Sequence, residues 1–248
     1  MKHLFLALGL TTVAGLAQAQ LYSNGPVVNS EGQSVLSVVS QSTFGVVSNA
    51  DFTVADNFVV TGPGWNVEKL DFFAYQTDSV GFTFTDVTWS IRRVDFGFNP
   101  GTAVTVASGS TAVTNGGFVG FRVIAFPVPD ALRPIWRISA DTPDLSLLPG
   151  EYFLTWALAG TGNDGPVVPP VLGSYGIGDG GWQQATGGSF IPVRDARSLQ
   201  SFDLPFEIQG SVVPEPAAVA MMLAGGLAVL TAAKLRRART GAGSSPAA

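Results

Sequence analysis

The chain contains 248 residues, of which 46% are hydrophobic and only 12% are charged, and its formal net charge is −5. High hydrophobicity with low charge argues against a disordered protein, and the scarcity of Lys and Arg argues against nucleic-acid binding. There is no cysteine, and the one histidine is His3. Because we expect His3 to be removed with the N-terminal segment, disulfides, Cys or His catalysis and N/S-ligand zinc sites are excluded. Carboxylate chemistry and calcium sites with oxygen ligands remain possible; we predict no cofactor and assign no residue to a metal.

Residues 1–19 have the pattern of a secretory signal peptide. A positive charge at Lys2 is followed by the apolar run 4–16 and by an A-x-A site at Ala17 and Ala19. The apolar run is shorter than the roughly 20 residues that span a bilayer, which favours a cleaved signal over an uncleaved N-terminal anchor. We expect cleavage after Ala19, which leaves Gln20 as the mature N-terminus.

The C-terminal segment 212–239 has three parts in a fixed order. The motif Val213-Pro214-Glu215-Pro216 comes first, and the uncharged apolar stretch 217–233 follows it. As a helix this stretch would be about 26 Å long at 1.5 Å per residue, which is at the short limit for a transmembrane helix. Basic residues after it favour a cytoplasmic C-terminus, so that the body of the chain lies outside; they are Lys234, Arg236, Arg237 and Arg239. We expect residues 240–248 to be a disordered tail.

This tripartite segment resembles the PEP-CTERM sorting signal of exported bacterial proteins. In that family the tail is recognised by exosortase, a membrane-embedded cysteine transpeptidase-like enzyme, and is removed near the motif, typically in bacteria that make extracellular polysaccharide. The resemblance implies that Pro214, Glu215 and Pro216 are recognition residues and that exosortase and the inner membrane are partners. The two prolines disfavour helix and sheet pairing and so keep the peptide extended for a protease. The alternative is a plain C-terminal anchor with a proline-containing spacer.

The body, residues 20–211, has the pattern of one all-β domain. Apolar and polar residues alternate at 87–92 and at 152–158, which is typical of strands with one buried face. We expect turns at 61–64, at 99–101 and at Asn115-Gly116-Gly117, where Asn-Gly suits a tight hairpin. Many short strands without helices predict a jelly-roll-like antiparallel β-sandwich. The further strands are expected at 35–39, 52–60, 67–76, 103–108, 118–126, 135–139 and 202–210.

The stretch 160–188 is rich in Gly and Pro and is expected to be a long surface excursion. Tyr175 and Trp182 are its main large side chains, and they form the candidate ligand platform on which a sugar could stack. The other tryptophans lie in strand patterns and are expected in the core; they are Trp65, Trp89, Trp136 and Trp156. Two patches, 55–77 and 202–210, resemble segments common in exported PEP-CTERM proteins, and sheet packing is the simpler explanation for them.

Acidic side chains are the remaining candidates for chemistry. Residues 20–213 hold 17 acidic and 8 basic residues, a net charge near −9. A glycosidase needs two facing carboxylates about 5–10 Å apart, but nothing in the sequence marks a pair among Glu31, Glu68, Glu151 and Glu207. The turns Asn163-Asp164-Gly165 and Gly178-Asp179-Gly180 could offer oxygen ligands to calcium, although Asp-Gly is above all a turn dipeptide.

These observations predict a non-enzymatic protein, exported through a signal peptide and anchored by one C-terminal transmembrane helix until exosortase acts. The expected role is structural or adhesive, at the cell surface or in extracellular matrix. The first alternative is a lectin-like carbohydrate-binding module that contacts extracellular polysaccharide. A glycosidase that uses carboxylates alone is the third hypothesis.

Overall fold

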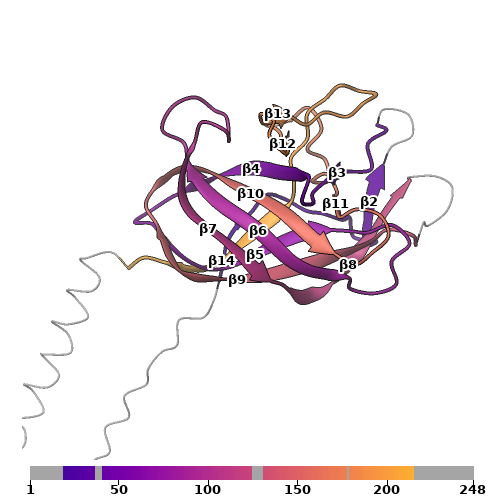
Figure 1. Ribbon diagram of the computed structural model, residues 1–248, viewed down its shortest axis with the longest axis horizontal. Coiled ribbons are helices and arrows are strands. Elements are labelled where there is room, and N and C mark those ends of the chain that lie inside the picture. The colour runs from indigo at the N-terminus through magenta and orange to yellow at the C-terminus, as the bar shows by residue number, and fades with distance from the viewer. Residues whose placement is uncertain (1–18, 37–40, 125–130, 178, 215–248) are drawn as a thin grey trace, which may run out of the picture.

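The computed structural model describes residues 19–36, 41–124, 131–177 and 179–214, and this part of the chain is all-β with no helix (Figure 1). The described residues accordingly include no helix that could cross a membrane. The predicted signal peptide up to residue 18, the motif residues Glu215 and Pro216, the apolar stretch 217–233, the basic end and the tail lie outside the described residues.

Two six-stranded sheets make up the body. The first has the order β1 (Ala19–Ser23), β14 (Phe206–Val212), β5 (Trp65–Ala74), β9 (Pro134–Leu147), β8 (Thr114–Ile124) and β2 (Gln33–Leu36). The second has the order β13 (Ile191–Pro192), β12 (Trp182–Ala185), β4 (Phe52–Val60), β10 (Gly150–Gly160), β6 (Phe84–Arg93) and β7 (Val104–Ala112). A two-stranded sheet joins β11 (Val167–Val168) to β3 (Val46–Val47).

The prediction of an all-β body is confirmed, and the strand expected at 52–60 is observed with the same bounds as β4. The pairing is antiparallel in all but one of the described strand pairs. β2 pairs in parallel with β8, with Gln33 opposite Phe121, so the first sheet is mixed. The reason is a crossover: the segment 24–32 carries the chain from the end of β1, at one edge of the sheet, across to the other edge.

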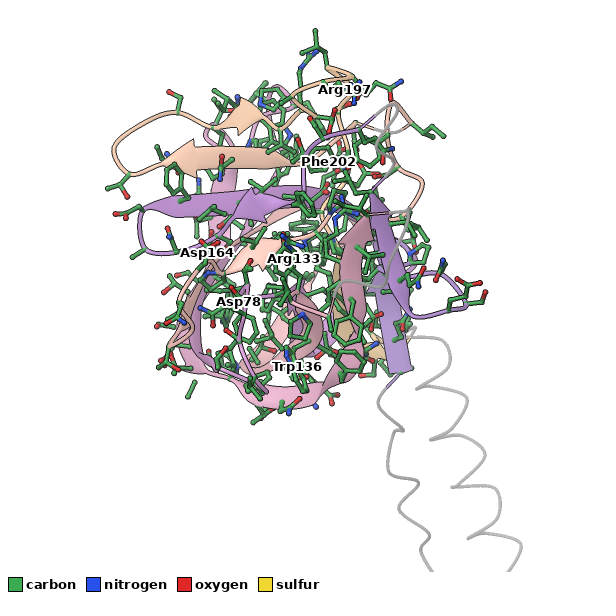
Figure 2. The ribbon with its side chains drawn as sticks, turned by 90° about the vertical axis from the view of Figure 1, so that its right-hand side faces the viewer. Asp78, Arg133, Trp136, Asp164, Arg197 and Phe202 are labelled. Atoms are coloured by element: carbon green, nitrogen blue, oxygen red, sulfur yellow. The ribbon has the colours of Figure 1, made fainter. Side chains whose placement is uncertain are left out.

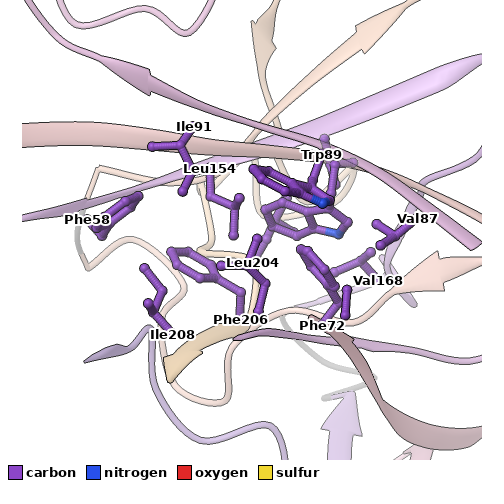
Figure 3. Close-up of a cluster of buried hydrophobic side chains, with 14 of the residues drawn as sticks. Phe58, Phe72, Val87, Trp89, Ile91, Leu154, Val168, Leu204, Phe206 and Ile208 are labelled. Carbon is purple, nitrogen blue, oxygen red and sulfur yellow. The ribbon is translucent and has the colours of Figure 1, made fainter. Parts of the chain in front are cut away.

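One core fills the space between the two sheets (Figure 3). The alternation in β6 and β10 turns Trp89, Ile91, Leu154 and Trp156 inward, and all four are almost fully buried. Across the interface the ring of Trp156 lies 5.6 Å from that of Phe72 on β5 and 5.8 Å from that of Phe206 on β14. Since the chain has no disulfides, burial of these rings is the main source of its stability.

Three of the four tryptophans expected in the core are buried there. Trp65, Trp89 and Trp156 are each at most 5% exposed. Trp136 is only half-buried and packs at the margin of the core, with Phe82 and Phe118 edge-on to its ring. In Figure 2, side chains fill the space between Trp136 near the bottom and Phe202 nearer the top.

The hairpin predicted at Asn115-Gly116-Gly117 is wrong. These residues lie inside β8, where the register against β9 shifts between Asn115 and Gly117. Asn115 Oδ1 accepts the N–H of Gly117 (2.8 Å), and Gly117 has a φ of +115°. The Asn-Gly signal therefore marks a bulge, and β7 passes through Val113 directly into β8. The turns expected at 61–64 and 99–101 are confirmed.

The stretch 160–188 is more ordered than a surface excursion. It contributes β11 and β12, and Val168 and Val171 are buried. Strand β12 adds to the second sheet beside β4, with Trp182 opposite Ala55. The Gly and Pro content thus reflects turns between short packed segments.

A buried arginine joins this end of the molecule to the first sheet. Arg122 on β8 is 1% exposed and donates to the carbonyls of Phe44 and Thr43, each at 2.8 Å. The same segment donates two N–H groups, from Ser42 and Thr43, to the carboxylate of Asp195. Burial opposes ionisation of Asp195, but these donors and the N–H groups of residues 197 and 198 outweigh it and hold its pKa well below its usual range.

Candidate functional site

Three carboxylates converge where β4 meets the segments before β12 and β14. One oxygen each from Asp56, Asp179 and Asp203 lies within 4.8 Å of the others. Asp56 is fully buried and accepts the N–H groups of Asn57 (2.8 Å) and Leu204 (2.6 Å). Asp203 accepts the N–H of Gly180 at 3.0 Å, which fixes the loop that carries Asp179. We call these three residues the acidic cluster.

Burial and mutual repulsion disfavour full ionisation of the acidic cluster. Burial, with the nearby charges of Asp203 and Asp179, raises the pKa of Asp56 well above its usual range. Burial and the charge of Asp179 raise the pKa of Asp203 to about 6. Burial and the charge of Asp56 also raise the pKa of Tyr22, whose hydroxyl donates to Asn24 Oδ1 (2.9 Å). A proton shared by the carboxylates, or a hard cation bound by their oxygens, would reduce the repulsion among the three acids.

The raised pKa of Asp203 predicts a specific pH dependence. Its folded-state pKa lies above its unfolded value, so the stabilisation is complete at low pH and is lost as the pH rises through about 6. Asp203→Asn keeps the oxygen that binds Gly180 but carries no charge. We expect this variant to have a smaller decline of the unfolding midpoint between pH 4 and pH 7, and a higher midpoint at pH 7, in thermal melts without added divalent ions.

The exposed Asp51→Asn change supplies the matched control, because it removes one negative charge away from the acidic cluster. We expect the Asp51→Asn variant to have the same dependence of the unfolding midpoint on pH as the wild type. An Asp203→Asn profile parallel to wild type would contradict the electrostatic account of the acidic cluster.

A second group of acids lies on the outer face of the first sheet. Glu207 and Asp71 are direct neighbours on β14 and β5, and Ser139 follows on β9. Arg137 Nη1 lies 2.8 Å from Glu207 and 3.3 Å from Asp71, so a guanidinium bridges the two carboxylates. Burial raises the pKa of Glu207 and the Arg137 charge opposes that shift. The arrangement is a polar network across three strands rather than an open pair of catalytic acids.

Of the four glutamates considered for a glycosidase, Glu207 lies beside another carboxylate, that of Asp71. Glu31 and Glu68 are exposed, and Glu151 lies on β10 opposite Val59. Of the two turns considered for calcium, the second brings Asp179 to two other acids, whereas Asp164 in the first offers its backbone carbonyl to Thr77 N.

A cavity of about 520 Å³ opens beside β3 and β13. Apolar side chains of Val46, Phe52 and Ile191 line it, together with Gln183 and Arg194. Gln183 is committed to the fold, because its side-chain amide donates to the carbonyl of Val47 at 2.7 Å. The lining of the cavity is therefore mainly apolar, and Arg194 is its one cationic side chain among the described residues.

The two residues of the candidate ligand platform are half-buried and pack against different rings. Tyr175 lies 5.2 Å from Phe202, and its hydroxyl is 3.4 Å from Arg122 Nη2. Trp182 lies edge-on to Phe153 at 6.5 Å, and its indole N–H has no hydrogen-bond partner among the described residues. The structure does not pair the two rings as one stacking surface.

Three of the residues predicted for cleavage and sorting are described: Ala19, Val213 and Pro214. Ala19 lies on β1, and Val213 follows the last residue of β14. Val213 still donates its N–H to Gly64, while Pro214 is exposed. Ala17, Glu215, Pro216 and the basic residues lie outside the described part of the chain.

The sequence reasoning missed Asp56 and Asp203, although a signal was present. Alternate residues of β4 face the core, and Asp56 occupies an inward position between Val54 and Phe58. An acid at such a position needs a specific partner, which here is the N–H of Leu204. Comparison with known proteins adds no assignment, because the chain matches no family model, no curated protein and no solved structure.

Proposed function

We propose that this chain is an exported, non-enzymatic surface or matrix protein, whose body serves a structural or adhesive role and whose C-terminal tail is an exosortase sorting signal. Export uses the segment 1–19, and the tail anchors the chain in the inner membrane until processing. We also propose that the body is a jelly-roll-like β-sandwich. The two six-stranded sheets that face each other support this fold. The parallel pairing of β2 with β8 differs from the purely antiparallel sandwich that the sequence predicts.

The observation that carries the proposal is where the core lies along the chain. Within the described residues, the buried residues of the core between the two sheets run from Val46 to Ile208. Strand β14 ends at Val212, directly before the motif that starts at Val213. Both proposed processing points, after Ala19 and near Pro214, therefore lie outside the part of the sequence that supplies this core.

Internal engagement of the polar groups favours a structural role over the alternatives. The carboxylates Asp71 and Glu207 are bridged by Arg137. Because both form ion pairs, neither is placed as the protonated general acid or the free carboxylate nucleophile that a glycosidase needs. Tyr175 and Trp182 are half-buried against separate rings, and this weakens the case for a lectin-like module. Contact with extracellular polysaccharide remains part of the alternative function.

The sorting proposal is tested by changing the motif in the full chain, in the cells that produce it. We expect the wild-type protein to lose its tail and to leave the membrane fraction. The double variant Pro214→Ala/Glu215→Gln should instead accumulate at full length in the membrane, because the recognised peptide has lost its charge and one rigid residue. Immunoblots of membrane and extracellular fractions measure this distribution.

Glu31→Gln is the matched control, since Glu31 is an exposed acid within the body. It should be distributed as wild type. If the motif variant were processed and released like wild type, the plain C-terminal anchor with its proline-containing spacer would be the better explanation.

A further inference from the structure

Strand β7 is an outer strand of the second sheet, and within the described part of the chain it pairs only with β6 (Figure 1). It is nine residues long, and each residue is exposed or half-exposed. Its sequence, VTVASGSTA, contains no charged residue and no proline. Outer strands with unpaired backbone groups can template pairing with another chain, and proteins usually protect them with charges, prolines, bulges or short length.

Strand β13, at the other edge of the second sheet, has such protection, since it has two residues and one of them is Pro192. Strand β7 has one protective feature, a bulge, because its register against β6 shifts between Ile91 and Arg92 and leaves Val106 without an opposite residue. Of the two edges of this sheet, β7 is therefore the one that combines length with the absence of charge and proline.

Exposed apolar side chains accompany this edge. Val104 and Val106 on β7 are 51% and 45% exposed, and Phe96 in the preceding loop is 88% exposed. A pairing partner would cover these side chains as well as the backbone groups of β7. Burial of apolar area next to a backbone ladder is the usual energetic basis of strand addition.

We propose that β7 pairs in antiparallel fashion with β7 of a second copy of this chain, so that two second sheets form one continuous sheet. The charges argue for a second copy. The body carries a net charge near −9, yet no like charges meet at this edge. The charged residues of β6 that pair with β7 are Arg93, opposite Val104, Arg92, opposite Thr105, and Asp86, opposite Ala112. A twofold axis would bring the Arg93 end of one copy to the Asp86 end of the other, and Arg93 also pairs with Asp95.

Overlap of the two strands about their central residue places Ser108 opposite Ser108 of the second copy, with the bulge at Val106 two residues away from the axis in each strand. Directly opposed Cβ atoms in an antiparallel pair are about 4.5–5.5 Å apart, which is close to the reach of a disulfide. The absence of cysteine from the whole sequence makes this register directly testable. A single introduced cysteine can form a disulfide only with another molecule.

The experiment compares Ser108→Cys with Thr88→Cys in the full-length chain, under mild oxidation at about 10 µM protein. Thr88 is exposed and lies one strand further in, opposite Ser110, so it controls for random collision. Paired thiols have effective concentrations in the mM range, so we expect the Ser108→Cys dimer to form about 100-fold faster than the Thr88→Cys dimer. Equal rates, or no Ser108→Cys dimer, would overturn the proposal.

A second pair of variants tests the edge without relying on the exact thiol geometry. Val106→Lys, added to the Ser108→Cys chain, places two like charges at the contact and should slow dimer formation at least about tenfold, since an edge lysine opposes strand addition. Thr88→Lys in the same background should leave the rate unchanged. Near-ultraviolet circular dichroism of each variant verifies folding, and the proposal fails if both lysines act equally.

Discussion

Replacement of Trp156 by alanine is expected to lower the free energy of unfolding by about 3–5 kcal/mol. The ring is fully buried at the centre of the core and contacts rings from the opposite sheet, those of Phe72 and Phe206. The alanine variant would leave a cavity between the two sheets that the surrounding strands cannot close. Chemical denaturation of the folded protein, followed by tryptophan fluorescence, measures the loss.

Trp156→Phe is the matched control for this prediction. The indole N–H of Trp156 is buried without a hydrogen-bond partner among the described residues, so phenylalanine removes no hydrogen bond and only part of the ring. We expect a cost below about 2 kcal/mol, in the range of conservative core changes. Similar costs for the two variants would show that Trp156 is not the packing centre of the two sheets.

Replacement of Arg122 by methionine is expected to lower the free energy of unfolding by about 2–4 kcal/mol, from the balance of two effects. Burial of the guanidinium has a desolvation cost and lowers its pKa, so its removal recovers some free energy. The change also leaves the carbonyls of Thr43 and Phe44 without their charged donor, and an unpaired buried carbonyl costs about 1–3 kcal/mol. Because two carbonyls are affected, the loss outweighs the gain.

The exposed Arg93→Met change is the control, since its surface ion pair with Asp95 should contribute less than about 1 kcal/mol. Hydrogen exchange adds a positional readout: in Arg122→Met the N–H groups of Ser42 and Thr43, which bind Asp195, should exchange faster. Unchanged protection of these two groups would contradict a tethering role for Arg122.

The class of fold could be predicted because strand periodicity is a local property. The alternation in 87–92 and 152–158 reports directly which side chains face the core, and these segments form two neighbouring interior strands of the second sheet, β6 and β10. The parallel pairing of β2 with β8 could not be predicted in this way, because it depends on a crossover between the two edges of the first sheet. The Asn-Gly signal at 115–116 was misleading because a bulge and a hairpin require the same backbone freedom.

The acidic cluster could not be predicted from the sequence either, because its residues are far apart along the chain. Asp56 lies 123 positions before Asp179 in the sequence and 147 before Asp203, so no spacing rule connects them. The two patches with family resemblance nevertheless meet here, through the hydrogen bond from Leu204 N to Asp56. This contact contributes to a charged site that neither patch reveals separately.

The central claim is that both ends of the chain are processing signals that flank one folded body. The most direct measurement is the intact mass of the protein from the membrane and extracellular fractions of its native cells. The account predicts an extracellular product that begins at Gln20 and ends near Pro214. A membrane-bound product that retains residues 217–248 would contradict it and would leave a permanently anchored β-domain.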